Sequence, residues 1–178
     1  MSGCIEVICG PMFAGKTKGL IRRLRREQSC GARIQAFKPA IDNRYGDANI
    51  VSHDASAFEA TPVDGVGDLE VAVRANTHVV GIDEVQFFDV GVAHLAQDLA
   101  NRGVRVIVAG LDVDYRAEPF GPMTYLLAVA ETVVKLRSVC ACGREAVRSR
   151  RKSGGGSLVE IGGADLYEPV CRACFVVR

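Results

Sequence analysis

The chain has 178 residues, of which 48% are hydrophobic, and a formal net charge of +1 at pH 7. This length suits one domain with a small appendage, and the apolar content excludes an intrinsically disordered protein. The balanced charge argues against overall attraction to nucleic acid or to a membrane surface. The sequence contains no apolar run of membrane-spanning length and no signal-like N-terminus, so the expected location is the cytoplasm.

Up to about residue 138, short apolar segments alternate with helix-like segments. Near-continuous apolar runs are typical of strands that are buried on both faces, and the alternation predicts right-handed βαβ units around a largely parallel sheet. The polar stretch 42–65 is expected to form a hairpin or a loop excursion. Strands are predicted at CIEVIC (4–9), RIQAFKP (33–39), HVVGIDE (78–84) and VRVIVAGLD (104–112), and helices over 18–29, 67–75, 89–101 and 122–130.

Residues 10–17, GPMFAGKT, match the phosphate-binding loop pattern G-x-x-x-x-G-K-[ST] between the first strand and the first helix. Gly10 and Gly15 allow the backbone to turn several N–H groups into one concavity. Lys16 can reach the outer phosphates of a nucleotide, and the Thr17 hydroxyl can ligate the Mg²⁺ that accompanies them. The candidate phosphate-binding residues are Gly10, Pro11, Met12, Phe13, Ala14, Gly15, Lys16 and Thr17.

An acidic pair, Asp83 and Glu84, ends the apolar run HVVGIDE. A carboxylate at the carboxyl end of a strand beside a phosphate-binding loop suits the magnesium shell, which makes Asp83 the metal-side candidate. Because neighbouring side chains of a strand alternate, Glu84 is expected to face the substrate and to act as a general base.

Two classes of function fit these motifs. If Glu84 activates water, the protein is an ATPase motor or switch; if it activates a substrate hydroxyl, the protein is a small-molecule kinase. The kinase is favoured because little chain is left for partner domains, and because a Gly-rich segment and several aromatic residues could form a substrate pocket.

The composition changes after Leu136, where a basic run, a Gly-rich segment and four of the seven cysteines follow. We therefore predict two domains, a nucleotide-binding α/β domain over 1–138 and a small domain over 139–178. Clustered cysteines in a cytosolic chain argue for a metal site. The four are Cys140, Cys142, Cys171 and Cys174.

The chain resembles the cellular-type (type II) thymidine kinase family from about Cys4 to Cys174. The segments that carry the resemblance lie in the family's order and spacing: GPMFAGKT, GIDEVQFF, GLDVDYRAEPFGPM, VVKL and IGGADLYEPVCRACF. The resemblance implies a RecA-like P-loop domain and a small zinc-ribbon domain with a lasso loop from about Arg150 to Tyr167. It also implies transfer of the ATP γ-phosphate to the 5′-hydroxyl of thymidine or deoxyuridine with Mg²⁺, a homotetramer, and inhibition by dTTP.

The same resemblance assigns roles to individual positions. Glu84 matches the family's general base and Asp83 its magnesium-side acid. Arg44 matches a position near the phosphates, and Tyr167 matches a tyrosine over the base. The positions implied in nucleoside binding are Met12, Asp42, Gln86, Phe87, Leu111, Phe120, Ile161, Gly162, Gly163, Ala164 and Tyr167.

The first cysteine pair departs from the family, because Cys140-Ala141-Cys142 is one residue shorter than C-x-x-C. Side chains at i and i+2 of a turn can converge only if the backbone twists, which Gly143 could allow. We expect one structural Zn²⁺ on all four cysteines. The alternative function is a zinc-ribbon nucleic-acid-binding P-loop ATPase, which would use the same loop, the cysteines and the basic run RSRRK.

Overall fold

A computed structural model describes residues 3–42, 49–52, 56–152 and 162–175. Its centre is a six-stranded sheet in which every neighbouring pair runs parallel, so the predicted α/β class is confirmed. None of the helices in these ranges has the length and apolar character needed to span a membrane. In spatial order the strands are β5 (Thr61–Val63), β2 (Ile34–Pro39), β6 (Val79–Ile82), β7 (Arg105–Gly110), β1 (Cys4–Cys9) and β8 (Thr132–Lys135).

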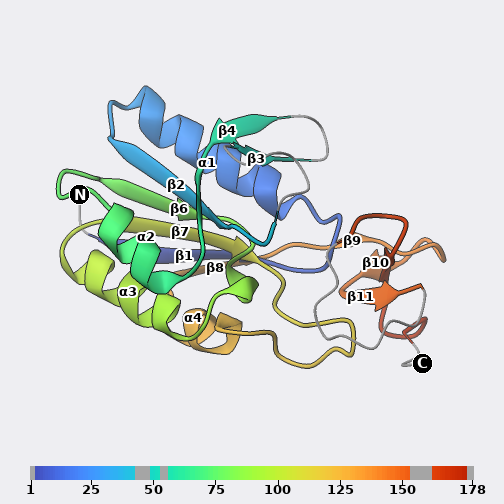
Figure 1. The fold of residues 1–178 in the computed structure, drawn as a ribbon. Helices are drawn as coiled ribbons and strands as arrows, with labels where there is room; N and C mark the ends of the chain where they lie inside the picture. Colours follow the sequence, from blue (N-terminus) through green and yellow to red (C-terminus); the bar gives the residue numbers. More distant parts are fainter. Residues whose placement is uncertain (1–2, 43–48, 53–55, 153–161, 176–178) are drawn as a thin grey trace.

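Helices cover both faces of this sheet (Figure 1). On one face lies α1 (Lys16–Ser29), which carries a hairpin of β3 (Asn49–Val51) and β4 (Ala57–Glu59) on its outer side. The other face is covered by α2 (Val66–Ala72), α3 (Gly91–Asn101) and α4 (Met123–Val129). Each layer buries its own apolar cluster against the sheet.

All four predicted helices and all four predicted strands are present. The largest difference is in the polar stretch 42–65, where the hairpin is followed by β5, which joins the sheet beside β2. Pro62 hides this strand from pattern analysis, because proline cannot donate to a ladder and is tolerated only at an edge. The predicted strand 78–84 ends at Ile82, so Asp83 and Glu84 lie beyond it.

The close seating of α1 on the sheet depends on Gly81. A Cβ at this position would lie 2.8 Å from Leu24 Cδ1, so a larger residue would push the helix away. This contact fixes the helix that begins at the phosphate-binding loop relative to β6, the strand that leads to the acidic pair.

One arginine of α1 is turned inward, toward the sheet. Arg23 forms an ion pair with Glu6, whose side chain is 8% exposed in the middle of β1. Arg105 bridges the same carboxylate at 2.8 Å and Glu27 at 2.8 Å. The buried charge at Glu6 is thus neutralised by two guanidinium groups, which removes the cost of leaving it unpaired.

The last part of the chain forms two short hairpins beside the carboxyl ends of the sheet (Figure 1). One pairs β9 (Ser138–Val139) with β10 (Glu145–Ala146), and the other pairs β11 (Arg148–Arg151) with β12 (Tyr167–Val170). Arg150, Arg151 and Tyr167 are therefore strand residues, which corrects the predicted lasso bounds. The division into domains at 138/139 stays a prediction, and this boundary falls within β9.

Candidate active site

The phosphate-binding loop runs from the end of β1 to the start of α1. Gly10 and Gly15 have φ values of 132° and 83°, as the predicted turn requires, and Phe13 also has a positive φ of 62°. A Cβ on Gly10 would lie 2.4 Å from the carbonyl oxygen of Leu136, so the first glycine is needed for packing as well. Lys16 Nζ donates a 2.9 Å hydrogen bond to the carbonyl oxygen of Pro11 within the loop.

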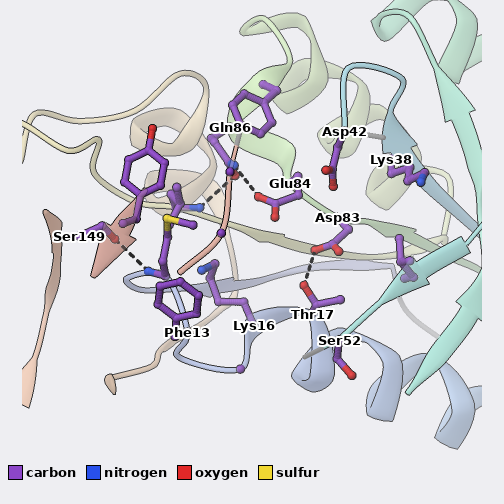
Figure 2. Close-up of a pocket in the computed structure, with 18 of the residues that line it drawn as sticks. Phe13, Lys16, Thr17, Lys38, Asp42, Ser52, Asp83, Glu84, Gln86 and Ser149 are labelled. Carbon is purple, nitrogen blue, oxygen red and sulfur yellow. Dashed lines mark hydrogen bonds between the residues drawn. The ribbon is translucent and has the colours of Figure 1, made fainter. Parts of the chain in front are cut away.

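Thr17 and Asp83 meet at the centre of the site (Figure 2). The Thr17 hydroxyl donates to Asp83 Oδ1 at 3.3 Å, and Asp83 is 5% exposed. Burial, followed by the nearby Glu84 carboxylate, raises the pKa of the Asp83 carboxyl above its usual range. A divalent cation between the Thr17 and Asp83 oxygens would offset both the burial of the Asp83 charge and its repulsion by Glu84. Hydroxyl and carboxylate oxygens are the ligands that Mg²⁺ prefers.

Glu84 has a left-handed backbone, with φ 49° and ψ 40°, and precedes a short 3₁₀ helix, Val85–Phe87. Because β6 ends at Ile82, strand alternation does not set the direction of the Glu84 side chain, and both carboxylates line the same cavity. A left-handed conformation of a non-glycine residue costs about 1–3 kcal/mol and is concentrated at functional sites. The surrounding turn supports it, because Phe87 N donates to the Glu84 carbonyl oxygen at 3.1 Å.

Gln86 lies between Glu84 and the end of β7. Its Nε2 donates to Glu84 Oε2 at 2.6 Å, and its Oε1 accepts from the Leu111 N–H at 3.0 Å. The residue is 2% exposed. Gln86 thus connects the carboxylate to the backbone of the residue that follows the strand.

These groups line one cavity of about 590 Å³ (Figure 2). In the close-up, Phe13 and Ser149 lie on one side of Glu84, and Lys38 and Asp42 lie on the other. Most of the predicted site residues contribute to its wall. They are Met12, Phe13, Gly15, Lys16, Thr17, Asp42, Asp83, Glu84, Gln86, Phe87, Leu111, Phe120, Gly162, Gly163, Ala164 and Tyr167.

Five of the residues predicted to bind phosphate or nucleoside are not among the lining residues. Gly10, Pro11 and Ala14 belong to the loop but not to the cavity wall, and Arg44 and Ile161 lie outside the described part of the chain. The cavity also has lining residues that the sequence analysis did not select. They are Lys18, Lys38, Asn49, Ile50, Val51, Ser52, Asp114, Tyr115 and Ser149.

Some of the unselected residues reach the cavity through contacts that no local pattern encodes. Ser149, for example, accepts a 2.9 Å hydrogen bond from Met12 N across 137 positions of sequence. Lys38 could have been selected as a site residue from the sequence. A lysine near the end of an apolar strand, on the same sheet edge as Asp83, is unusual. It is 3% exposed at the end of β2.

Several aromatic side chains contribute to the cavity wall. Phe87 and Phe120 are perpendicular, with ring centroids 5.9 Å apart. The Arg151 guanidinium lies 4.0 Å from the ring centroid of Tyr115, a lining residue, and donates to the Tyr167 hydroxyl at 2.9 Å. Flat apolar walls with a few polar groups at fixed positions are suited to a planar heterocyclic ligand.

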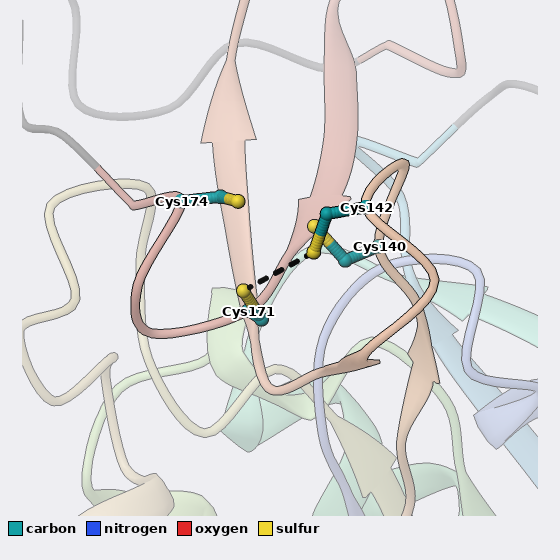
Figure 3. Close-up of side chains that lie close together, drawn as sticks. All are labelled: Cys140, Cys142, Cys171 and Cys174. Atoms are coloured by element: carbon teal, nitrogen blue, oxygen red, sulfur yellow. Dashed lines mark hydrogen bonds between the residues drawn. The ribbon is translucent and has the colours of Figure 1, made fainter.

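The four C-terminal cysteines gather between β9–β10 and β12 (Figure 3). Their sulfur atoms all lie within 4.8 Å of one another, and Cys142 Sγ is 3.7 Å from Cys171 Sγ. Four thiolates at about 2.3 Å from one Zn²⁺ would be about 3.8 Å apart in a tetrahedron. The short pair converges through a turn in which Gly143 has a φ of 81°, as expected, and donates to the Cys140 carbonyl oxygen at 2.8 Å.

Backbone hydrogen bonds favour thiolates in this cluster. Bonds from the backbones of Cys142, Arg144 and Cys174 hold the pKa values of Cys140, Cys142 and Cys171, respectively, below their usual range. The neighbouring sulfurs, first Cys142 and then Cys171, raise the pKa of Cys174 to about 12. Four adjacent sulfurs cannot all be ionised without a cation, so this donor set fits a closed zinc site.

Comparison with known proteins identifies the family. The family model described as thymidine kinase matches residues 3–175. A thymidine kinase of Porphyromonas gingivalis is 49% identical over 174 residues, which cover 97% of this chain and 85% of that protein. Thymidine kinases of Rhodothermus sp. and Bacteroides fragilis are 51% and 47% identical, over 97% of this chain and 81% and 87% of theirs. The chain is therefore a kinase that belongs to the thymidine kinase family.

Proposed function

We propose that this enzyme transfers the γ-phosphate of ATP to the 5′-hydroxyl of thymidine, or of deoxyuridine, and so produces dTMP from thymidine. One observation carries the proposal: a single cavity is lined by residues of the phosphate-binding loop, by the acidic pair and by aromatic side chains that suit a planar base. A phosphoryl donor and a nucleoside can therefore meet within it.

The donor phosphates belong on residues 10–17. Backbone N–H groups and the N-terminus of α1 offer positive potential there, and Lys16 can exchange its contact with the Pro11 carbonyl for a phosphate oxygen. Thr17 and Asp83 would hold the magnesium ion. When bound, Mg²⁺ neutralises charge that develops on the phosphate oxygens.

Glu84 would accept the proton of the 5′-hydroxyl as that oxygen attacks the γ-phosphorus. The O–H bond of the nucleoside breaks, the new P–O bond forms, and the β–γ bridging oxygen leaves with ADP. The left-handed turn supports this role, because it directs the Glu84 carboxylate into the cavity beside the buried Asp83.

The nucleoside would lie against the aromatic side chains of the wall. Phe87, Phe120 and Tyr167 offer apolar walls, and the backbone at 162–164 offers hydrogen-bonding groups for the base. Asp42, which is 8% exposed in the cavity wall, is proposed as a further nucleoside contact. The proposed roles of Arg44 and Ile161 concern residues outside the described ranges.

The four cysteines are proposed to hold one structural Zn²⁺. A complete set of four thiolates leaves no position for a reacting water, so the metal would act on stability. We also propose that dTTP inhibits the enzyme and that the enzyme is a homotetramer. Both proposals rest on membership of the family. Inhibition by dTTP is further supported by a single cavity that could accept both a base and phosphates.

A radiolabelled transfer assay from ATP to the common nucleosides tests the proposal. We expect label in dTMP and dUMP, and little ATP hydrolysis without nucleoside. ATP hydrolysis that DNA stimulates and thymidine does not would instead support the alternative, a nucleic-acid-binding ATPase.

A further inference from the structure

We propose that Gln86 is a positioning residue for phosphoryl transfer, which holds the Glu84 carboxylate through an amide anchored on the backbone of Leu111. The inference rests on the proposed function of Glu84 as the base. It replaces the sequence-based expectation that Gln86 contacts the nucleoside.

The orientation of the Gln86 amide is set by its partners. A backbone N–H can only donate, so the atom that faces Leu111 N at 3.0 Å must be the oxygen, Oε1. The nitrogen, Nε2, must then face Glu84, where it donates to Oε2 at 2.6 Å. The two bonds thus prevent the amide from flipping, and an ionised Glu84 is the favoured acceptor.

The anchor is rigid because Leu111 directly follows β7, a central strand of the sheet. Two glycines restrict Gln86 further. A Cβ on Gly110 would lie 2.7 Å from Gln86 Oε1, and a Cβ on Gly121 would lie 2.4 Å from its carbonyl oxygen. The side chain therefore has one well-defined place, with only 2% of the residue exposed.

Glu84 needs such a restraint because its backbone lies outside any strand, in a left-handed turn. A base must lie within hydrogen-bond reach of the proton that it accepts, and a misplacement of about 1 Å can cost about 10²-fold in rate. The bond from Gln86 fixes Oε2, and because a carboxylate is rigid and planar this also restricts the positions that Oε1 can take.

The test compares Gln86→Leu with the wild type by single-turnover phosphoryl transfer and by equilibrium binding of thymidine. We expect the transfer rate to fall about tenfold to a hundredfold, since the base is no longer held, while the Kd for thymidine changes less than about twofold. Gln35→Leu is the matched control. Its amide also bridges backbone groups, Ala72 O and Arg74 N, but away from the cavity, so it should affect stability and not the transfer rate.

A double-mutant cycle separates positioning from folding effects. In a Glu84→Gln background, Gln86→Leu should cause no further loss of rate, because there is no carboxylate left to position. Gln86→Asn keeps an amide that is too short to bridge both partners, and it should reproduce the loss if Gln86→Leu does not fold. An unchanged transfer rate in Gln86→Leu, with or without a tenfold weaker Kd for thymidine, would overturn the proposal. Additive losses of rate in the double mutant would overturn it as well. Absence of thymidine phosphorylation by the wild type would instead overturn the proposed function.

Discussion

The backbone N–H of Met12 donates a 2.9 Å hydrogen bond to the hydroxyl of Ser149, which joins the phosphate-binding loop to a strand of the C-terminal hairpins. A second bond, from Ser138 Oγ to the carbonyl oxygen of Phe13, reinforces the junction at 3.3 Å. The loop that would bind ATP is thus partly shaped by the last forty or so residues of the chain.

Removal of this bond should weaken nucleotide binding. Ser149→Ala leaves Met12 N without its partner, and the loss of one such hydrogen bond costs about 1 kcal/mol. If the loop is preorganised by the bond, the Kd for ATP should rise about fivefold, measured by calorimetry. Ser29→Ala, which removes an exposed bond to Arg25 O within α1, is the control and should leave the Kd unchanged. An equal Kd in all three proteins would show that the loop does not depend on Ser149.

Lys16→Ala should reduce both ATP affinity and the transfer rate. Lys16 is the residue of the 10–17 loop whose side chain carries a full positive charge. We expect a loss of about 10²-fold or more in kcat/KM, measured by steady-state kinetics with ATP varied. Arg22→Ala, an exposed cation on the same helix, should have wild-type kinetics. Unchanged kinetics in Lys16→Ala would contradict the assignment of the loop.

Replacement of one cysteine of the cluster should release the metal and destabilise the fold. Cys174→Ser is expected to lower the zinc content well below one per chain and the thermal midpoint by about 10 °C. Elemental analysis and a thermal melt give both values. Cys30→Ser, at an exposed thiol outside the cluster, serves as control. Wild-type protein without zinc, with four reactive thiols, would rule out the metal site.

The Glu6 carboxylate should contribute stability that depends on pH. Although burial opposes its charge, hydrogen bonds from Arg105 and Arg23 hold the pKa of Glu6 below its usual range. The contribution is therefore present above the unfolded pKa, about 4.3, and is lost as the pH falls through the lower folded value. At neutral pH, Glu6→Gln should lower the free energy of unfolding by about 3 kcal/mol, because it leaves partly buried Arg23 without its carboxylate partner and leaves Arg105 with that of Glu27 alone.

Urea unfolding at a series of pH values measures this effect. The difference between wild type and Glu6→Gln should shrink as the pH falls below about 4.3. Glu145→Gln is the control, because the Glu145 side chain is 68% exposed in its pair with Arg137, and exposed pairs contribute little. A difference that stays constant down to acid pH would contradict the assignment to Glu6.

The sequence was sufficient to predict what contiguous residues encode. The loop at 10–17, the acidic pair and the parallel strands all follow from local spacing and apolar runs. The sequence was insufficient where structure depends on distant contacts. Ser149 reaches Met12 through the pairing of two hairpins, and β5 forms at a sheet edge despite Pro62.

Glu84 illustrates an expectation whose structural reason was wrong. Strand alternation was expected to direct its side chain away from that of Asp83, but the strand ends at Ile82. Glu84 instead has a left-handed backbone, and no residue type at this position indicates it, because glutamate rarely adopts this conformation.

The most direct test of the account is single-turnover transfer of labelled phosphate from ATP to thymidine by the wild type and by Glu84→Gln. The amide keeps the size of the side chain but cannot accept the hydroxyl proton. We predict that the transfer rate falls by about 10²–10⁴-fold. The Kd values for ATP and thymidine should stay close to those of the wild type. A Glu84→Gln enzyme that keeps more than about half of the wild-type rate would contradict the role of Glu84 as the base.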